Sequence, residues 1–173
     1  SCKIKVYNKI TYNLNGGKQN KSNKTSFCKQ TVKLYSPTRA KYTFGGWYTD
    51  KGLKKKITSI SNKTTKNVTL YAKWKKVTQC SAPSKVTLKN SKAKTMAVSI
   101  KSVSGAKGYE ITYSTSSKFS GAKKKTITGK TVNIGSLSKR KTYYVKVRAY
   151  KLDSTGAKVY GKYSKTVKVQ IRK

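Results

Sequence analysis

The residues best able to do chemistry in this chain are its lysines, which gather in three dense clusters. The 173 residues include 42 Lys and Arg but only three acids, so the net charge is +39. The clusters are Lys54-Lys55-Lys56, Lys123-Lys124-Lys125 and Lys139-Arg140-Lys141. Any one cluster is more often plain solvated surface, but the total charge attracts phosphate and sulfate polymers without selecting among them. These nine side chains are candidate contacts for a polyanion.

Catalysis has few suitable residues here. No histidine is present to act as a general base near neutral pH. The three acids, Asp50, Glu110 and Asp153, lie far apart in sequence, and paired-carboxylate chemistry would need two of them to converge. Glu110 falls on the outer face of an expected strand, where we expect it to be exposed, so an isopeptide cross-link is also disfavoured. We predict no catalytic residues and no cofactor.

The cysteines fit neither a metal site nor a disulfide scaffold. Cys2, Cys28 and Cys80 are scattered, so they supply no paired metal ligands. Either one disulfide forms beside a leftover thiol, or all three are thiols. If a disulfide forms, we expect Cys28 with Cys80, both at the end of the first module where its first strand finishes, with Cys2 at the opposite end.

The composition raises the question of disorder, since only 35% of residues are hydrophobic and the charge is high. The charge is spread along the chain, with +18 on residues 1–78 and +21 on residues 79–173. Apolar residues nevertheless alternate over long runs, and the chain contains 13 Tyr and 2 Trp. Disordered chains are poor in aromatic and β-branched residues, so this alternation predicts a folded chain of β-strands.

Four strands are expected in the first half. Residues 4–14 alternate with period two and end at a glycine turn. Residues 31–35 form a second strand, antiparallel to the first, and residues 68–74 form the closing one. Between them, residues 42–50 place four aromatics around Gly45 and Gly46, which indicates a strand close to a neighbouring backbone. We assign Phe44 and Trp47 to the core and leave Tyr48 as a candidate exposed contact.

The second half carries seven short alternating segments separated by turn residues, which is typical of a β-sandwich. In the strongest segment, alternate residues from Tyr143 to Ala149 face one way, and those from Tyr144 to Tyr150 face the other. Tyr144 and Tyr150 are the aromatics that we expect to be exposed, where they could stack on bases or sugar rings.

Two resemblances follow from these motifs. The segments 10–17, 42–50 and 69–74 together resemble the internalin B-repeat, or Listeria–Bacteroides repeat, a small β-grasp-like module of bacterial surface proteins. Residues 105–114 and 137–149 resemble a fibronectin type III domain, with Tyr143 at the position of that family's corner tyrosine. An Arg-Gly-Asp is absent, so integrin binding has no support.

We therefore expect a mainly β chain, with a B-repeat-like β-grasp module at residues 1–78 and a fibronectin type III-like sandwich at residues 79–173. The resemblances imply a non-catalytic spacer or adhesive segment of a larger secreted or surface-displayed bacterial protein. Its charge implies anionic partners such as teichoic acid, sulfated glycan or extracellular DNA, bound non-specifically. No apolar run is long enough to enter a membrane. The alternative is a specific glycan- or protein-binding module acting through its loops.

Overall fold

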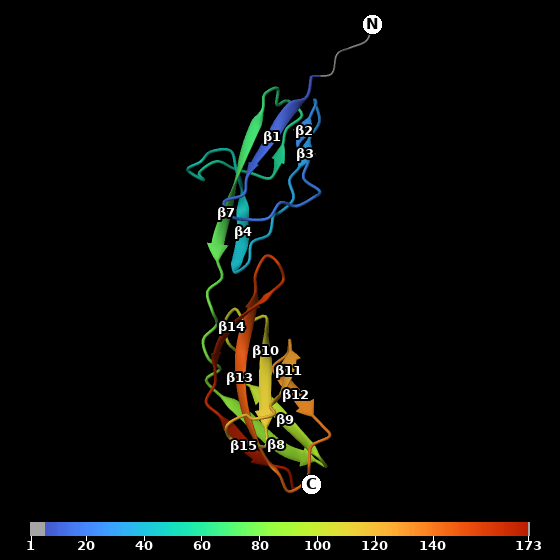
Figure 1. Cartoon of the computed structure of the whole chain (residues 1–173), viewed down its shortest axis with the longest axis vertical. Helices are drawn as coiled ribbons and strands as arrows, with labels where there is room; N and C mark the ends of the chain where they lie inside the picture. Colours follow the sequence, from blue (N-terminus) through green and yellow to red (C-terminus); the bar gives the residue numbers. More distant parts are fainter. Residues whose placement is uncertain (1–5, 173) are drawn as a thin grey trace. The chain divides into compact units, whose positions relative to one another are not determined.

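The structure is a computed structural model that describes residues 6–172, except for the side chain of Ser91. The described residues form fifteen β-strands and no helix. Contacts divide the chain into two compact units, which separate between Val77 and Thr78, and the segment Asp153–Ala157 groups with the first unit (Figure 1). That residues 1–78 and residues 79–173 are two separate domains stays a prediction.

The first unit is built on a mixed sheet with strand order β2-β1-β7-β4-β5. Its strands are β1 (Asn8–Asn13), β2 (Ser26–Phe27), β4 (Tyr42–Tyr48), β5 (Lys56–Ile57) and β7 (Val68–Lys76). A second pair joins β3 (Val32–Lys33) to β6 (Ser59–Ile60). The central strands β1 and β7 run parallel, so the predicted first and closing strands lie side by side (Figure 1).

The aromatic stretch of β4 supplies the centre of this unit's core, as predicted. Trp47 is buried against Leu70 and Ala72, and Phe44 packs on the edge of the same cluster. Between Phe44 and Gly46 the pairing of β4 with β7 shifts register, and Gly46 has a φ of +124° that side chains rarely adopt. The glycines are therefore required by a bulge in the strand.

Three expectations for the first unit are wrong. Tyr48 is buried and is not an exposed contact. Val6 lies outside β1 and is 70% exposed. The strand that pairs with β1 is Ser26–Phe27, because residues 31–35 turn away to meet β6. The backbone of Tyr35 is bonded by the Asn23 side chain in place of a neighbouring strand: the side chain accepts a hydrogen bond from the Tyr35 amide and donates one to the Tyr35 carbonyl.

The second unit is a two-layered antiparallel sandwich, as predicted. One sheet has the order β12-β9-β8, from β8 (Val86–Lys92), β9 (Thr95–Ile100) and β12 (Thr131–Ile134). The other has the order β11-β10-β13-β14, from β10 (Gly108–Ser114), β11 (Lys123–Ile127), β13 (Thr142–Leu152) and β14 (Lys158–Tyr163). A further strand, β15 (Val167–Gln170), pairs with the first part of β13 (Figure 1).

The core of the second unit lies between these two sheets. Val98 and Met96 of β9 pack in one buried cluster with Ile111 of β10 and Val147 of β13. The Tyr143 hydroxyl accepts a hydrogen bond from the amide of Ser138, at 3.1 Å, five residues earlier. Tyr143 is therefore a corner tyrosine, at the position that the sequence indicated.

Candidate functional site

The candidate site is the face of the β11-β10-β13-β14 sheet that points away from the core, which we call the open face. Alternate residues of each strand lie on it, because successive side chains of a strand point to opposite sides. On β13 the core side carries Val145 and Val147, so Tyr144, Lys146 and Arg148 lie on the open face. The face is therefore built from polar and aromatic side chains over an apolar core.

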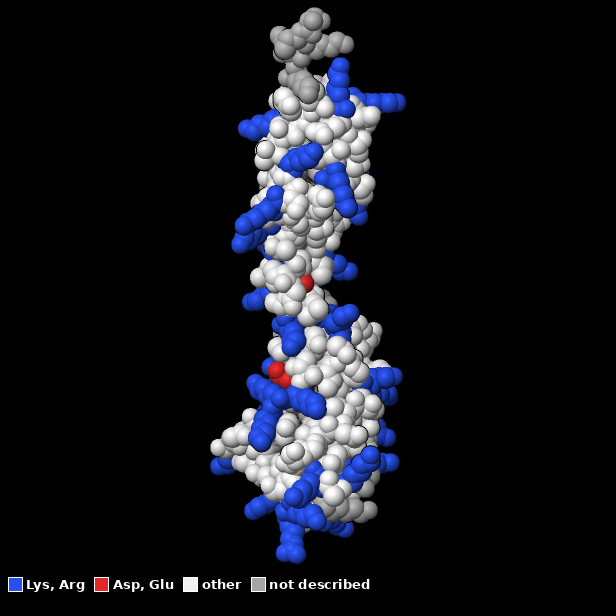
Figure 2. Space-filling view, turned by 90° about the vertical axis from the view of Figure 1, so that its right-hand side faces the viewer, with Lys and Arg blue, Asp and Glu red and all other residues white. Residues whose placement is uncertain are grey.

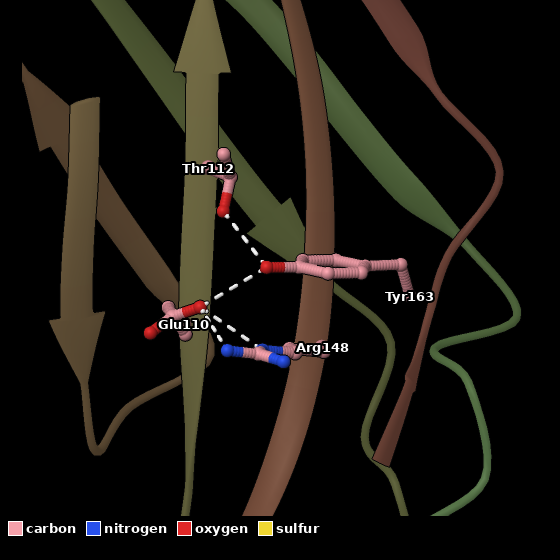
Figure 3. Close-up of polar contacts among 4 residues, drawn as sticks. All are labelled: Glu110, Thr112, Arg148 and Tyr163. Carbon is pink, nitrogen blue, oxygen red and sulfur yellow. Dashed lines mark hydrogen bonds and ion pairs between the residues drawn. The ribbon is translucent and has the colours of Figure 1, made fainter. Parts of the chain in front are cut away.

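Glu110 is the centre of a polar cluster on this face. One of its carboxylate oxygens accepts a hydrogen bond from Nε of Arg148 at 2.9 Å, and Nη2 of the same guanidinium forms an ion pair with this oxygen, also at 2.9 Å. The same oxygen accepts a hydrogen bond from the Tyr163 hydroxyl at 3.2 Å, and that hydroxyl lies 3.3 Å from Oγ1 of Thr112. Figure 3 shows how these side chains converge from β10, β13 and the end of β14. Within the described part of the chain this is the one ion pair.

The cluster holds Glu110 in its charged form. Burial raises the pKa of this carboxyl, but the positive charge of Arg148 and the hydrogen bonds from Arg148 and Tyr163 outweigh burial. The pKa of Glu110 therefore lies below its ordinary value of 4.5. A charged, paired carboxylate is a structural anchor and is unsuited to general-acid work at neutral pH.

Arg148 also belongs to a ladder of cations and aromatic rings, in which each member contacts the next. In order along the open face, the ladder consists of Phe119, Lys146, Tyr163, Arg148, Tyr160, Tyr150 and Lys158. The Lys146 ammonium lies 4.1 Å from the Phe119 ring centre and 4.7 Å from that of Tyr163. The Arg148 guanidinium lies 3.8 Å from the Tyr160 ring centre and 4.8 Å from that of Tyr163.

Each such contact stabilises by about 0.5–2 kcal/mol, depending on how far the cation is desolvated. The ladder joins β13 to β14 and to the loop that carries Phe119, whose φ of 60° is unusual for an aromatic residue. The open face is therefore held in a fixed arrangement by side chains from several segments.

The predicted lysine clusters are all exposed, but only part of one reaches the open face. Lys124 pairs in register with Thr112, which pairs with Lys146, so these three side chains share the face. Lys123 and Lys125 stand opposite Tyr113 and Ile111 and point to the other side of the sheet. The Lys125 ammonium bonds to the carbonyl of Asn133 on β12 at 3.4 Å.

The other two clusters lie in turns. Lys139, Arg140 and Lys141 precede β13, and Arg140 has a φ of 60°. Lys54, Lys55 and Lys56 belong to the first unit and lie at the start of β5. The Asp50 carboxylate orders their turn by accepting bonds from the amides of Lys54 and Lys55. Figure 2 shows Lys and Arg side chains over much of the visible surface, with very little acidic surface between them.

Comparison with known proteins identifies the first unit. Residues 8–73 match the sequence model of the Listeria-Bacteroides repeat domain. This part of the chain is a Listeria–Bacteroides repeat module. Its β-grasp classification stays a prediction, whereas its all-β character is confirmed. None of the curated proteins compared with the chain matches it.

The second unit is a fibronectin type III-like domain, by its two sheets and corner tyrosine. Similar solved structures include the FN5 domain of Drosophila Lar, at 21% identity and a TM-score of 0.44, covering 54% of this chain and 98% of that one. An Fn3-like protein from Clostridium thermocellum is 23% identical with a TM-score of 0.42, covering 56% and 97%. The FN1–FN3 domains of chicken CNTN1 are 18% identical with a TM-score of 0.48, covering 64% and 38%.

Two expectations for the fibronectin type III-like domain are corrected. Glu110, expected to be exposed, is 6% exposed, because Arg148 and Tyr163 cover it. Tyr150, expected to be a free stacking surface, is buried with its ring against Tyr160 and its hydroxyl group packed near Gly108. Tyr144 is half-buried on the open face.

The cysteines give no support to the predicted pair. Cys28 is a partly exposed thiol of the repeat module, and Cys80 is a buried thiol of the fibronectin type III-like domain. The reasoning that placed Cys28 where β1 finishes is wrong, since Phe27 pairs with Asn8 at the start of β1. Cys2 lies outside the described residues.

The described residues contain no cluster of potential metal ligands. Between residues 6 and 172, no three His, Cys, Asp or Glu side chains gather as metal ligands. The same range has no helix with the length and apolar character needed to cross a membrane.

Sequence reasoning missed several members of the ladder, namely Phe119, Lys146, Arg148, Tyr160 and Tyr163. A signal was present in β13, where Lys146 and Arg148 stand between Tyr144 and Tyr150 on the non-core face.

Proposed function

We propose that this chain is a non-catalytic spacer and adhesive segment of a secreted or surface-displayed bacterial protein, and that its cationic surface binds anionic polymers. The candidates are teichoic acid, sulfated glycan and extracellular DNA. The Listeria–Bacteroides repeat and the fibronectin type III-like fold support the class of protein. The net charge of +39 supports an anionic polymer as the partner.

One observation carries the proposal: all three acids are engaged by groups of the protein, while the lysine clusters face solvent. Asp50 accepts bonds from amides of its own turn, Glu110 is paired with Arg148, and Asp153 accepts bonds from Thr155 and Ala157. The nine clustered basic residues are exposed. A surface with so few free anions repels itself and binds polyanions with release of their counterions.

A second candidate is recognition of a specific glycan or protein through loops. A groove of about 520 Å³ in the fibronectin type III-like domain favours it. The groove is lined largely by hydroxyl groups, with Lys123 at its edge, and the hydroxyl residues are Tyr113, Ser114, Thr115, Ser120, Ser136, Ser138 and Tyr143.

The test is binding of the whole chain to purified teichoic acid, dextran sulfate, duplex DNA and neutral dextran at physiological salt. We expect the three anionic polymers to bind with similar affinity and neutral dextran not to bind. Binding of only one polymer, or binding that persists in molar salt, would favour the loop-specific alternative. An absence of binding to all of them would leave a spacer and overturn the adhesive part of the proposal.

A further inference from the structure

We infer that the open face of the fibronectin type III-like domain is the main contact surface for an acidic polysaccharide, through Lys124, Lys146 and Lys168. The inference rests on the proposed function and narrows it from a diffuse charge to one built surface. These three lysines differ from the clusters of consecutive residues that the sequence indicates, because residues adjacent in a strand point to opposite sides.

Strand register places the three lysines on one side of the sheet. Lys124 and Lys146 both stand beside Thr112, from β11 and β13. Lys168 of β15 stands beside Tyr144, two residues before Lys146 on β13. Cross-strand neighbours point to the same side of a sheet, so all three belong with Tyr144.

Their spacing allows the three charges to act together. Strands lie about 4.8 Å apart and alternate residues about 6.7 Å apart, so the Cα atoms of Lys124 and Lys168 each lie about 8–10 Å from that of Lys146 and about 16 Å from each other. The shorter separation is close to the Debye length of about 8 Å at physiological ionic strength. The field of the Lys146 ammonium therefore overlaps that of each of the other two, and an anionic polymer can contact all three in a row.

The acid on this face does not cancel that field. Glu110 lies one row further along β10, but its charge is matched by Arg148, with the pair at 2.9 Å. The ladder also fixes Lys146 between Phe119 and Tyr163. A side chain already ordered loses less conformational entropy when it binds, which favours this lysine over those in turns.

The state of the rings favours a polysaccharide over a single-stranded nucleic acid. Proteins that bind single strands stack bases on free aromatic faces. Here Tyr163 already contacts Lys146 and Arg148, and Tyr160 contacts Arg148. Tyr150 is buried and Tyr144 is half-buried, so neither offers a fully free ring face. The face instead offers ammonium groups together with hydroxyl groups such as that of Thr126, which stands beside Glu110 and is exposed. Sulfate or carboxylate groups and sugar hydroxyls match these side chains.

The chain supplies a matched control in the other sheet, outside the nine clustered residues. The test variant carries Lys124→Gln and Lys168→Gln, and the control carries Lys89→Gln and Lys101→Gln, on β8 and just after β9. Both lose two charges, and all four side chains are exposed, so both variants should fold. Affinity of the whole chain for dextran sulfate is measured by calorimetry at several salt concentrations, with circular dichroism melting as the check on folding.

We expect the test variant to lose about tenfold in affinity and about two units of salt slope, with less than a twofold change in the control. Equal losses in both variants would overturn the inference while leaving the proposed function intact. A larger loss in the control would place binding at the other sheet and would also overturn the inference. Duplex or single-stranded DNA bound more tightly than dextran sulfate through the same lysines would overturn the choice of polysaccharide. If the unmodified chain fails to bind, the proposed function itself fails.

Discussion

Replacing Glu110 by Gln should destabilise the fibronectin type III-like domain by about 2 kcal/mol. The change removes the charge from the carboxylate oxygen that lies 2.9 Å from both Nε and Nη2 of Arg148, and it leaves that guanidinium without a counter-charge. Hydrogen bonds to charged groups contribute about 1.5–3 kcal/mol each, and breaking a buried pair costs about 3–5 kcal/mol. The Arg148 side chain is 23% exposed, so water compensates for part of the loss and the lower value applies. For a domain of this size, the melting temperature should fall by about 8–16 °C.

The assay uses a difference between the two units. Trp47 and Trp74 both belong to the repeat module, so tryptophan fluorescence follows that module alone. Near-ultraviolet circular dichroism contains tyrosine signals from both units, so the part of that signal that does not follow the tryptophan transition reports the fibronectin type III-like domain. In urea, that part should move to lower concentration while the tryptophan transition stays in place. A double-mutant cycle with Arg148→Met should give a coupling of at least about 1 kcal/mol. A loss below about 0.5 kcal/mol in the Glu110 variant would refute the role of the pair.

Three further results are expected. Because the pKa of Glu110 is lowered on folding, its stabilisation is complete above pH 4.5 and is lost as the pH falls through the folded value, so acid titration should narrow the gap between the unmodified chain and the Gln variant. Gly46→Ala forces a side chain into positive φ and against Lys56, and should destabilise the repeat module by about 1–3 kcal/mol, seen by tryptophan fluorescence in urea. Tyr143→Phe leaves the Ser138 amide without its acceptor and should cost about 1–2 kcal/mol by circular dichroism melting, and an unchanged midpoint would contradict that bond's role.

The sequence was sufficient for the elements whose pattern is local. Period-two alternation identified the core side of β13 correctly, since burial of Val145 and Val147 determines where every neighbour points. The bulge in β4 was marked by its glycines. Pairing was harder to predict: β1 pairs with Ser26–Phe27, whereas residues 31–35 pair with β6 and bond to the Asn23 side chain.

The environment of Glu110 could not be deduced in the same way. Its partners Arg148 and Tyr163 lie 38 and 53 residues further along the chain, and nothing local specifies them. The lysines of the open face are also far apart in the sequence, because they come from three strands. The sequence alone therefore indicated only the clusters of consecutive lysines.

The salt dependence of polyanion binding by the whole chain tests the central claim most directly. Log affinity for dextran sulfate should fall linearly with log salt concentration, with a slope of about −0.7 to −0.9 for each charge neutralised, so at least about −2 if three lysines engage together. A slope near zero, with binding retained at high salt, would contradict the account.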